Sequence, residues 1–130
     1  MDYEKTLEDL EKNLVNLAEE NKTVPIIVEG DKDIQALRKL GISGEIIRFN
    51  QGLSIPDFCD MISRKYHSII LLADWDKKGG FLCSTIRKNL EGLVEINTRY
   101  REMFAKRTTI RTLEGLPSWI ETLRKKIRGE

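Results

Sequence analysis

Histidine and cysteine are scarce in this chain, and their scarcity argues against several kinds of site. The 130 residues include one histidine, His67, and two cysteines, Cys59 and Cys83, with no Cys-x-x-Cys pair. A structural zinc site takes four ligands, mostly of these two types, so we do not expect one. The two cysteines make no disulfide framework. They stand among apolar neighbours, and we interpret them as small core residues.

Long apolar runs are also missing. No stretch approaches the roughly 20 apolar residues that span a bilayer, and the N-terminal sequence MDYEKTLEDLEKNL lacks the apolar centre of a signal peptide. We therefore expect a cytoplasmic protein with no membrane partner. Hydrophobic residues make up 40% of the chain and charged residues 33%, which is typical of one folded domain with a modest core.

Charge is divided unevenly along the chain, although the net charge is only +1. Residues 1–20 contain seven acidic and two basic side chains, whereas residues 99–130 contain nine basic and four acidic ones. A basic C-terminal end could contact a phosphate backbone, and the alternative is an ordinary solvated helix face. The cations that would form such a face are Arg99, Arg101, Arg107, Arg111, Lys125 and Lys126.

Apolar residues near the N-terminus are spaced by four, three, four and three positions, which predicts an amphipathic helix to about residue 21. They are Tyr3, Leu7, Leu10, Leu14 and Leu17. This narrow stripe could pair with a second chain, leaving a homodimer open. We favour packing on the chain's own sheet, because the stripe is short.

Strands and helices alternate along the rest of the chain, which predicts an α/β fold with a mainly parallel sheet of about four strands flanked by helices. We expect a central domain at residues 22–112, preceded by the N-terminal helix at 1–21. A basic C-terminal helix at 113–130 packs on the same domain. The expected strands are 23–28, 45–49, 68–73 and 93–98, with a further one at 108–112, and the expected helices are 32–40, 55–66, 78–91 and 116–127.

Acidic residues directly follow two of the expected strands. Glu29 follows the first strand, Asp74 follows the third, and Asp76 comes two residues after Asp74. Because parallel strands end at one edge of a sheet, these carboxylates should meet there. Mg²⁺ prefers hard oxygen ligands such as these, and Mn²⁺ could take its place because it accepts the same ligands. Glu29 could be a further ligand or a general acid or base.

Glycines and lysines accompany the acids and could hold a phosphate group. Gly30 permits a tight turn after Glu29, and Gly79 would let the start of a helix approach an anion closely. Lys77 and Lys78 could neutralise phosphate charge. Each feature alone has a plainer explanation, since "EGDKD" could be a turn and helix cap. Their convergence at one edge favours a metal and phosphate site.

These residues resemble the Toprim domain, the catalytic module shared by topoisomerases and bacterial-type primases. The resemblance rests on Glu29-Gly30 in "IIVEGDKD" and on Asp74-x-Asp76 in "IILLADWDKKG", and it covers roughly residues 22–112. It implies a Rossmann-like three-layer fold. It also implies that the glutamate is a general acid or base, that the aspartates coordinate Mg²⁺, and that the chemistry is phosphodiester or phosphoryl transfer on nucleic acid.

Two further positions match small stand-alone Toprim proteins similar to ribosomal-RNA maturation nucleases. Asp33 matches a position that is often acidic in them, and Gly79 matches a glycine that commonly follows the Asp-x-Asp. The breakage domain of topoisomerases and the zinc domain of primases are not found among these residues. The resemblance therefore favours a nuclease acting on RNA or DNA, alone or in a larger nucleic-acid-processing complex.

Other functions stay open at this point. Within the Toprim family, the alternatives are a primase-like nucleotidyl transferase and a non-catalytic scaffold that binds nucleic acid. Haloacid-dehalogenase-type phosphatases also use Asp-x-Asp, but they place it after the first strand, where this chain has Glu29-Gly30. In a receiver domain Asp74 would be phosphorylated, but no lysine is evident after a later strand.

Overall fold

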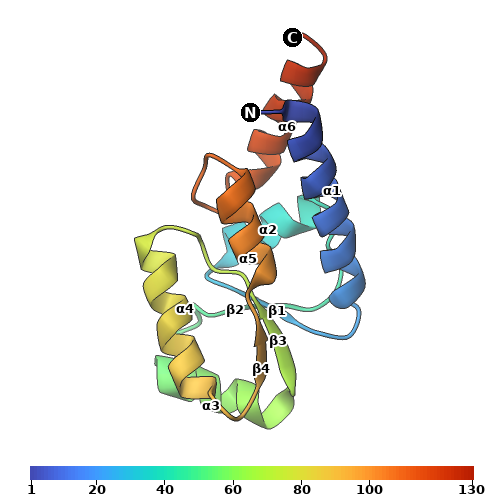
Figure 1. Cartoon of the computed structure of the whole chain (residues 1–130). Coiled ribbons are helices and arrows are strands. Elements are labelled where there is room, and N and C mark those ends of the chain that lie inside the picture. Colours follow the sequence, from blue (N-terminus) through green and yellow to red (C-terminus); the bar gives the residue numbers. More distant parts are fainter.

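The structure is a computed structural model that describes residues 1–130, and it contains six helices and four strands (Figure 1). In chain order they are α1 (Tyr3–Glu20), β1 (Ile26–Val28), α2 (Asp31–Lys39), β2 (Ile46–Arg48), α3 (Ile55–Lys65), β3 (Ser68–Leu71), α4 (Lys77–Leu90), β4 (Glu95–Asn97), α5 (Arg99–Arg107) and α6 (Leu116–Ile127).

The four strands form one parallel sheet in the order β2-β1-β3-β4. Ile26 of β1 pairs with Ile46 of β2 on one side and with Ile70 of β3 on the other. Parallel neighbours need a crossover, which α2, α3 and α4 provide. The predicted α/β fold with a four-stranded parallel sheet is confirmed.

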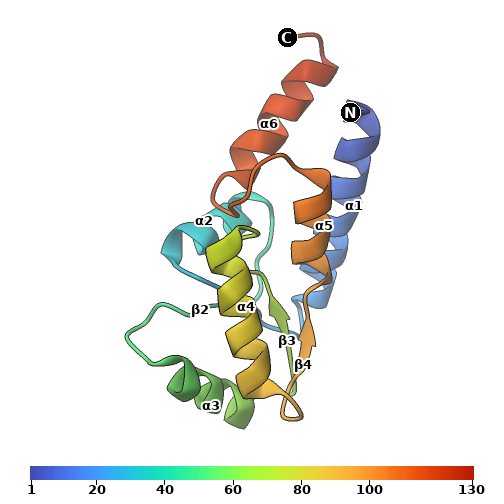
Figure 2. The ribbon, with the colours of Figure 1, turned by 60° about the vertical axis from the view of Figure 1, so that its left-hand side comes forward.

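Both faces of the sheet are covered, which makes three layers (Figures 1 and 2). Alternate strand residues point to opposite faces. Ile26 and Val28 belong to a core cluster with α1, α2, α5 and α6, whereas Ile27 belongs to a second cluster with α3 and α4. Cys59 and Cys83 are free and buried in the second cluster, in agreement with their interpretation as small core residues.

The N-terminal helix packs on its own domain. Leu10 and Leu17 of α1 have no exposed surface and share a core cluster with Ile120 of α6 and with the sheet. Figure 1 shows α1 and α6 side by side, with the two termini at the same end of the molecule. The division into three segments at residues 21 and 112 stays a prediction. None of the helices combines the length and apolar character needed to cross a bilayer.

The uneven charge along the chain is neutralised in part within the fold. Arg107 lies 3.1 Å from Asp9, Arg124 lies 3.7 Å from Glu11, and Arg99 lies 3.8 Å from Glu20. Each pair joins a basic residue near the C-terminus to an acidic residue of α1. Of the six cations proposed for a basic C-terminal face, Arg99 and Arg107 face carboxylates of their own chain, and a phosphate-binding role for this face stays a prediction.

The segment between β4 and α6 differs from the prediction. Residues 108–112 form a loop and not a strand, and residues 99–107, which have no predicted element, form α5. The β-branched sequence of 108–112 suggested a strand, but the segment lies beside no sheet edge. It accepts hydrogen bonds from Trp75 instead, since the indole Nε1 donates to the Ile110 carbonyl at 2.6 Å and the Trp75 backbone N–H donates to the Arg111 carbonyl at 3.0 Å.

Core packing of α1 predicts unequal effects of truncating two of its residues. Leu10→Ala removes a fully buried side chain and should lower the free energy of unfolding by about 2–5 kcal/mol. Val15→Ala changes a side chain that is 68% exposed and should have little effect. Urea unfolding of both variants provides the comparison, and equal losses would contradict the packing of α1 on this core.

Candidate functional site

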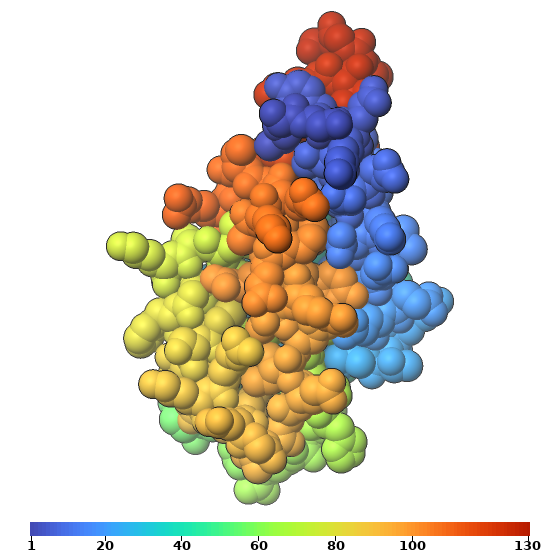
Figure 3. Space-filling model, in the orientation of Figure 1, coloured from blue at the N-terminus to red at the C-terminus, as the bar shows by residue number.

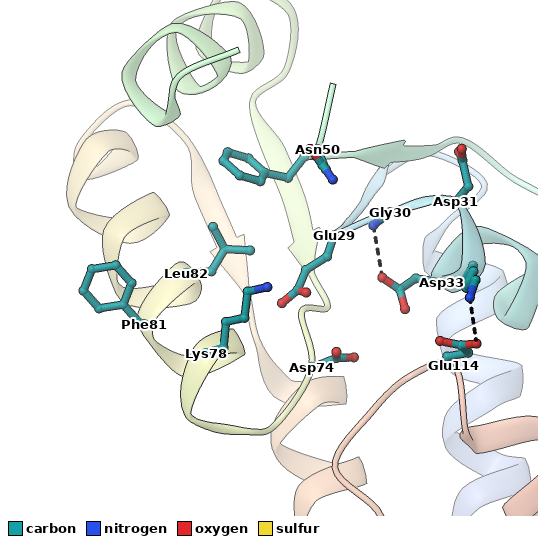
Figure 4. A pocket seen from close by; sticks show the side chains of 12 residues that line it. Glu29, Gly30, Asp31, Asp33, Asn50, Asp74, Lys78, Phe81, Leu82 and Glu114 are labelled. Carbon is teal, nitrogen blue, oxygen red and sulfur yellow. Dashed lines mark hydrogen bonds and ion pairs between the residues drawn. The ribbon is translucent and has the colours of Figure 1, made fainter. Parts of the chain in front are cut away.

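The site lies at the point where the strand order of the sheet reverses. β1 and β3 are neighbours, and the strands that follow them, β2 and β4, lie on opposite sides. Ligands of such sheets bind outside the carboxyl ends of strands at this point. A hollow of about 590 Å³ opens there (Figure 4), which we call the acidic cleft. Twelve residues line it, and the carboxylates among them are Glu29, Asp31, Asp33, Asp74 and Glu114.

The structure brings together some of the predicted site residues but not all of them. Those that line the acidic cleft are Glu29, Gly30, Asp33, Asp74 and Lys78, which come from α2, α4 and the turns that follow β1 and β3. Three others do not line it: they are Asp76, Lys77 and Gly79. Asp76 still acts on the cleft, because its negative charge raises the pKa of Glu29.

Glu29 is the central acid of the cleft. Burial raises its pKa above the ordinary value of 4.5, and the charges of Asp74, Asp33 and Asp76 raise it further, while Lys78 lowers it. Its Oε1 atom is buried and has no hydrogen-bond partner. A carboxylate in this position is stabilised by a proton or by a bound cation.

Asp74 is held at both its side chain and its backbone. The Leu113 N–H donates to its Oδ1 at 2.8 Å, and the Arg101 guanidinium donates to its carbonyl oxygen from Nε at 3.0 Å and from Nη2 at 2.9 Å. Burial raises the pKa of Asp74, and the Leu113 hydrogen bond opposes this shift. The hydrogen bonds therefore fix the orientation of the carboxylate, but burial still makes its charged form unfavourable.

Asp76 begins α4 and Trp75 anchors the turn before it. The Asp76 Oδ1 accepts a hydrogen bond from the Gly79 N–H at 2.7 Å, which caps the helix. The Trp75 ring is buried and packs against Phe104 of α5, with the ring centroids 5.5 Å apart. The alternating residues Asp74 and Asp76 thus point away from the core while Trp75 points into it.

Asp33 has a structural contact that its sequence position left open. It is only 9% exposed, and its Oδ2 accepts a hydrogen bond from the Gly30 N–H at 3.1 Å (Figure 4). This bond fixes the turn that carries Glu29, as in the helix-cap alternative. Burial also raises the pKa of Asp33. A direct role in substrate binding stays a prediction.

Gly79 makes a close contact with protein backbone. A Cβ atom at this position would lie 1.8 Å from the carbonyl oxygen of Asp74, so only glycine lets α4 begin here. At Gly80, the nearest atom to an added Cβ would be Nη2 of Arg101 at 3.5 Å, an ordinary contact. The sequence suggested that Gly79 makes room for a phosphate, and the structure shows that it makes room for the Asp74 turn.

The oxygen-rich cleft suits a hard cation such as Mg²⁺, which usually takes one or two carboxylates and completes its shell with water and substrate phosphates. The buried, unpartnered Oε1 of Glu29 is an available donor of this kind. No group of three or more Asp, Glu, His or Cys side chains is arranged to hold a metal ion by itself. The ligand set of Glu29, Asp74 and Asp76 therefore stays a prediction.

Sequence reasoning missed the roles of residues that support or line the cleft from other segments. Arg101 and Leu113 hold Asp74, and Glu114 adds a carboxylate whose charge raises the pKa of both Asp33 and Asp74. No local motif marks these residues, because each acts through a neighbour at least 27 positions away. Phe49, Asn50, Phe81 and Leu82 form the less charged wall of the cleft.

Comparison with known proteins agrees with the fold and with the family that the sequence resembles. The Toprim domain model matches residues 24–108, so the chain belongs to the Toprim-domain family. Toprim domains are modules associated with nucleic acids, and they generally bind a divalent metal such as Mg²⁺.

Relatives of similar length are found in archaea. A UPF0292 protein of Thermoplasma volcanium is 45% identical over 102 residues, which cover 78% of this chain and 86% of that protein. A UPF0292 protein of Methanocaldococcus jannaschii is 31% identical over 121 residues, covering 91% of each chain. Among solved structures, a putative protein from Aquifex aeolicus has a TM-score of 0.68 at 26% identity, covering 78% of this chain and 92% of that one.

The two glycines at the start of α4 should respond oppositely to alanine. Gly79→Ala forces Cβ into the Asp74 carbonyl and should lower the free energy of unfolding by about 1–3 kcal/mol. Gly80→Ala has room and should raise it by up to about 1 kcal/mol, because alanine favours helix. Urea unfolding measures both changes, and a neutral Gly79→Ala would show that the contact with Asp74 relaxes easily.

The raised pKa of Glu29 predicts a pH-dependent cost to stability. The folded protein holds the Glu29 proton more tightly than the unfolded chain, so in metal-free buffer stability falls as pH rises from 4.5 through the folded pKa. Glu29→Gln removes this cost and should melt at a higher temperature than wild type at neutral pH, with the difference vanishing below pH 4.5. Glu8→Gln, at an exposed position of α1, is the control. A Glu29→Gln protein less stable than wild type at neutral pH would contradict the electrostatic interpretation.

Proposed function

We propose that this protein is a Mg²⁺-dependent enzyme that acts on phosphodiester bonds of nucleic acid, and that it is a nuclease. The observation that carries the proposal is the environment of Glu29, whose buried oxygen has no partner in a cleft that it shares with Asp74 and Asp33. A folded protein keeps such repulsion where a ligand relieves it. Membership of the Toprim family supports a nucleic acid as the substrate.

In this proposal Asp74 and Asp76 hold the metal and Glu29 moves a proton. A bound Mg²⁺ would stabilise charge on the phosphate and lower the pKa of a water molecule. The raised pKa of Glu29 brings the carboxyl nearer to neutral pH, where a general acid or base works best. Arg101 and Leu113 keep Asp74 oriented, which limits the reorganisation needed when a ligand binds.

Cations and backbone groups near the acids would bind the substrate phosphate. Lys78 lines the cleft, and Figure 4 shows its side chain directed toward Glu29. Lys77 lies next to it at the exposed start of α4, where free helix N–H groups also favour an anion. Gly30 offers an open approach, because nothing lies within 4 Å of a Cβ built on it.

Single-turnover assays with structured and single-stranded RNA and DNA, with Mg²⁺ and with Mn²⁺, test these roles. Glu29→Gln should bind substrate but cleave it about 10²-fold more slowly or worse, the usual contribution of a general acid or base. Asp74→Asn should require a higher metal concentration, because a neutral amide replaces an anionic ligand. Asp31→Asn is the matched control, since Asp31 lies on the rim of the cleft and pairs with Arg48 at 2.9 Å.

A second measurement separates metal binding from catalysis. Mg²⁺ should raise the melting temperature of wild type and of Asp31→Asn more than that of Asp74→Asn, because a ligand of the folded state stabilises it. Cleavage that survives Glu29→Gln at full rate would point to a contaminating nuclease. A wild-type protein that cleaves nothing, yet binds nucleic acid equally well with and without metal, would be a non-catalytic scaffold.

A further inference from the structure

Helix α4 carries cations near both of its ends. Its sequence, KKGGFLCSTIRKNL, contains four basic residues and no acidic one. None of the four lies within 4.0 Å of a carboxylate, in contrast to the C-terminal cations Arg99, Arg107, Arg124 and Arg128, which all pair with acids. The helix that begins at the acidic cleft thus carries four cations that no carboxylate of the chain neutralises.

A second hollow of about 590 Å³ runs along the flank of α4 that faces β4 and α5. We call it the α4 groove. Ser84, Arg87 and Lys88 of α4 line it, Arg101 of α5 closes it toward the Asp74 turn, and Glu91 is its one carboxylate. In the space-filling view the outer surface of α4 is left uncovered by other elements (Figure 3). The groove therefore presents several cations and a hydroxyl group to solvent.

Phe81 lines the acidic cleft, and its neighbour in the chain, Gly80, lines the α4 groove. Phe81 is 73% exposed, more than any other large hydrophobic residue of the chain. Helical spacing places Lys77, Phe81, Ser84 and Lys88 along one exposed stripe of α4. Proteins that bind single-stranded nucleic acid combine aromatic side chains, which stack on bases, with cations that contact the backbone. The exposed Phe81 ring and the unpaired cations of α4 form such a combination.

We propose that the outer face of α4 is a track for single-stranded nucleic acid that leads from the acidic cleft past Phe81 into the α4 groove. This inference rests on the proposed function, because the cleft is where the bound strand would be cut. A base can stack on Phe81 only if its face is uncovered, which selects a single strand over a duplex. Arg87 and Lys88 contact the phosphates, and Ser84 can donate a hydrogen bond to them.

Binding measured without divalent metal tests the track independently of cleavage. Full-length protein is titrated with labelled single-stranded RNA, single-stranded DNA and duplex at several salt concentrations in a chelating buffer. The Arg87→Ser/Lys88→Ser variant should bind single strands more weakly, and its log–log salt slope should be shallower by about 1.4, which corresponds to two lost phosphate contacts. The Lys125→Ser/Lys126→Ser variant removes equal charge from α6 and should bind as wild type does.

The aromatic position has its own pair of variants. Phe81→Ala should weaken binding about five-fold or more with little change in salt slope, because stacking is lost and charge is kept. Phe81→Trp should restore the affinity. Phe81 is exposed in the folded protein, and the melting temperature of each variant confirms that it folds.

Several results would overturn the track. They are wild-type affinity in the α4 variants, an equal loss in the α6 control, tighter binding of duplex than of single strands, and an α4 that binds an acidic protein but no nucleic acid. The Glu29→Gln protein separates the two proposals. If the Glu29→Gln substitution abolishes cleavage while the α4 variants bind normally, the track is wrong and the proposed nuclease function stands. If the α4 variants lose binding and wild type cleaves nothing, the track stands and the nuclease function is wrong.

Discussion

The turn at Asp74 depends on groups that converge on it from three other parts of the chain. Its carbonyl oxygen accepts two hydrogen bonds from Arg101, its carboxylate accepts one from the Leu113 N–H, and Gly79 packs against its backbone without a Cβ atom. Each contact constrains the same residue, so the carboxyl end of β3 meets α4, α5 and the loop before α6 at a single point. The acidic cleft has a fixed shape because this turn cannot move without disrupting all three.

The acidic cleft also holds carboxyl groups whose charged forms are destabilised by burial and by one another. Glu29, Asp33 and Asp74 all have pKa values raised chiefly by burial, and each is raised further by neighbouring acids. A carboxylate that only capped a helix could stand in water at lower cost. Retaining three of them at the switch point of the sheet is physically reasonable if a cation and a phosphate ligand complete the site.

Charge elsewhere in the molecule is organised by the packing of helices. The acidic α1 lies against the basic C-terminal helices, and ion pairs such as Arg107 with Asp9 join them. These pairs contribute little stability individually, but they neutralise part of a surface that looks basic in the sequence. The cations of α4 have no such partners. Two of them, Lys77 and Lys78, stand at the end of α4 that borders the acidic cleft, where a polyanionic substrate would need them.

The sequence by itself determined the α/β class and the positions of Glu29 and Asp74 at strand ends, because short β-branched runs alternate with helical periodicity and because acids directly follow the strands. It also predicted α6 at the residues where it lies. Only the tertiary structure decided that β1 and β3 are neighbours, that residues 108–112 form a loop, and that α5 carries Arg101 to Asp74. Strand order and contacts between distant segments arise from packing the whole core, and no local pattern of residues encodes them. For the same reason, the ion pairs between α1 and the C-terminal cations depend on the packing that places α1 beside α5 and α6.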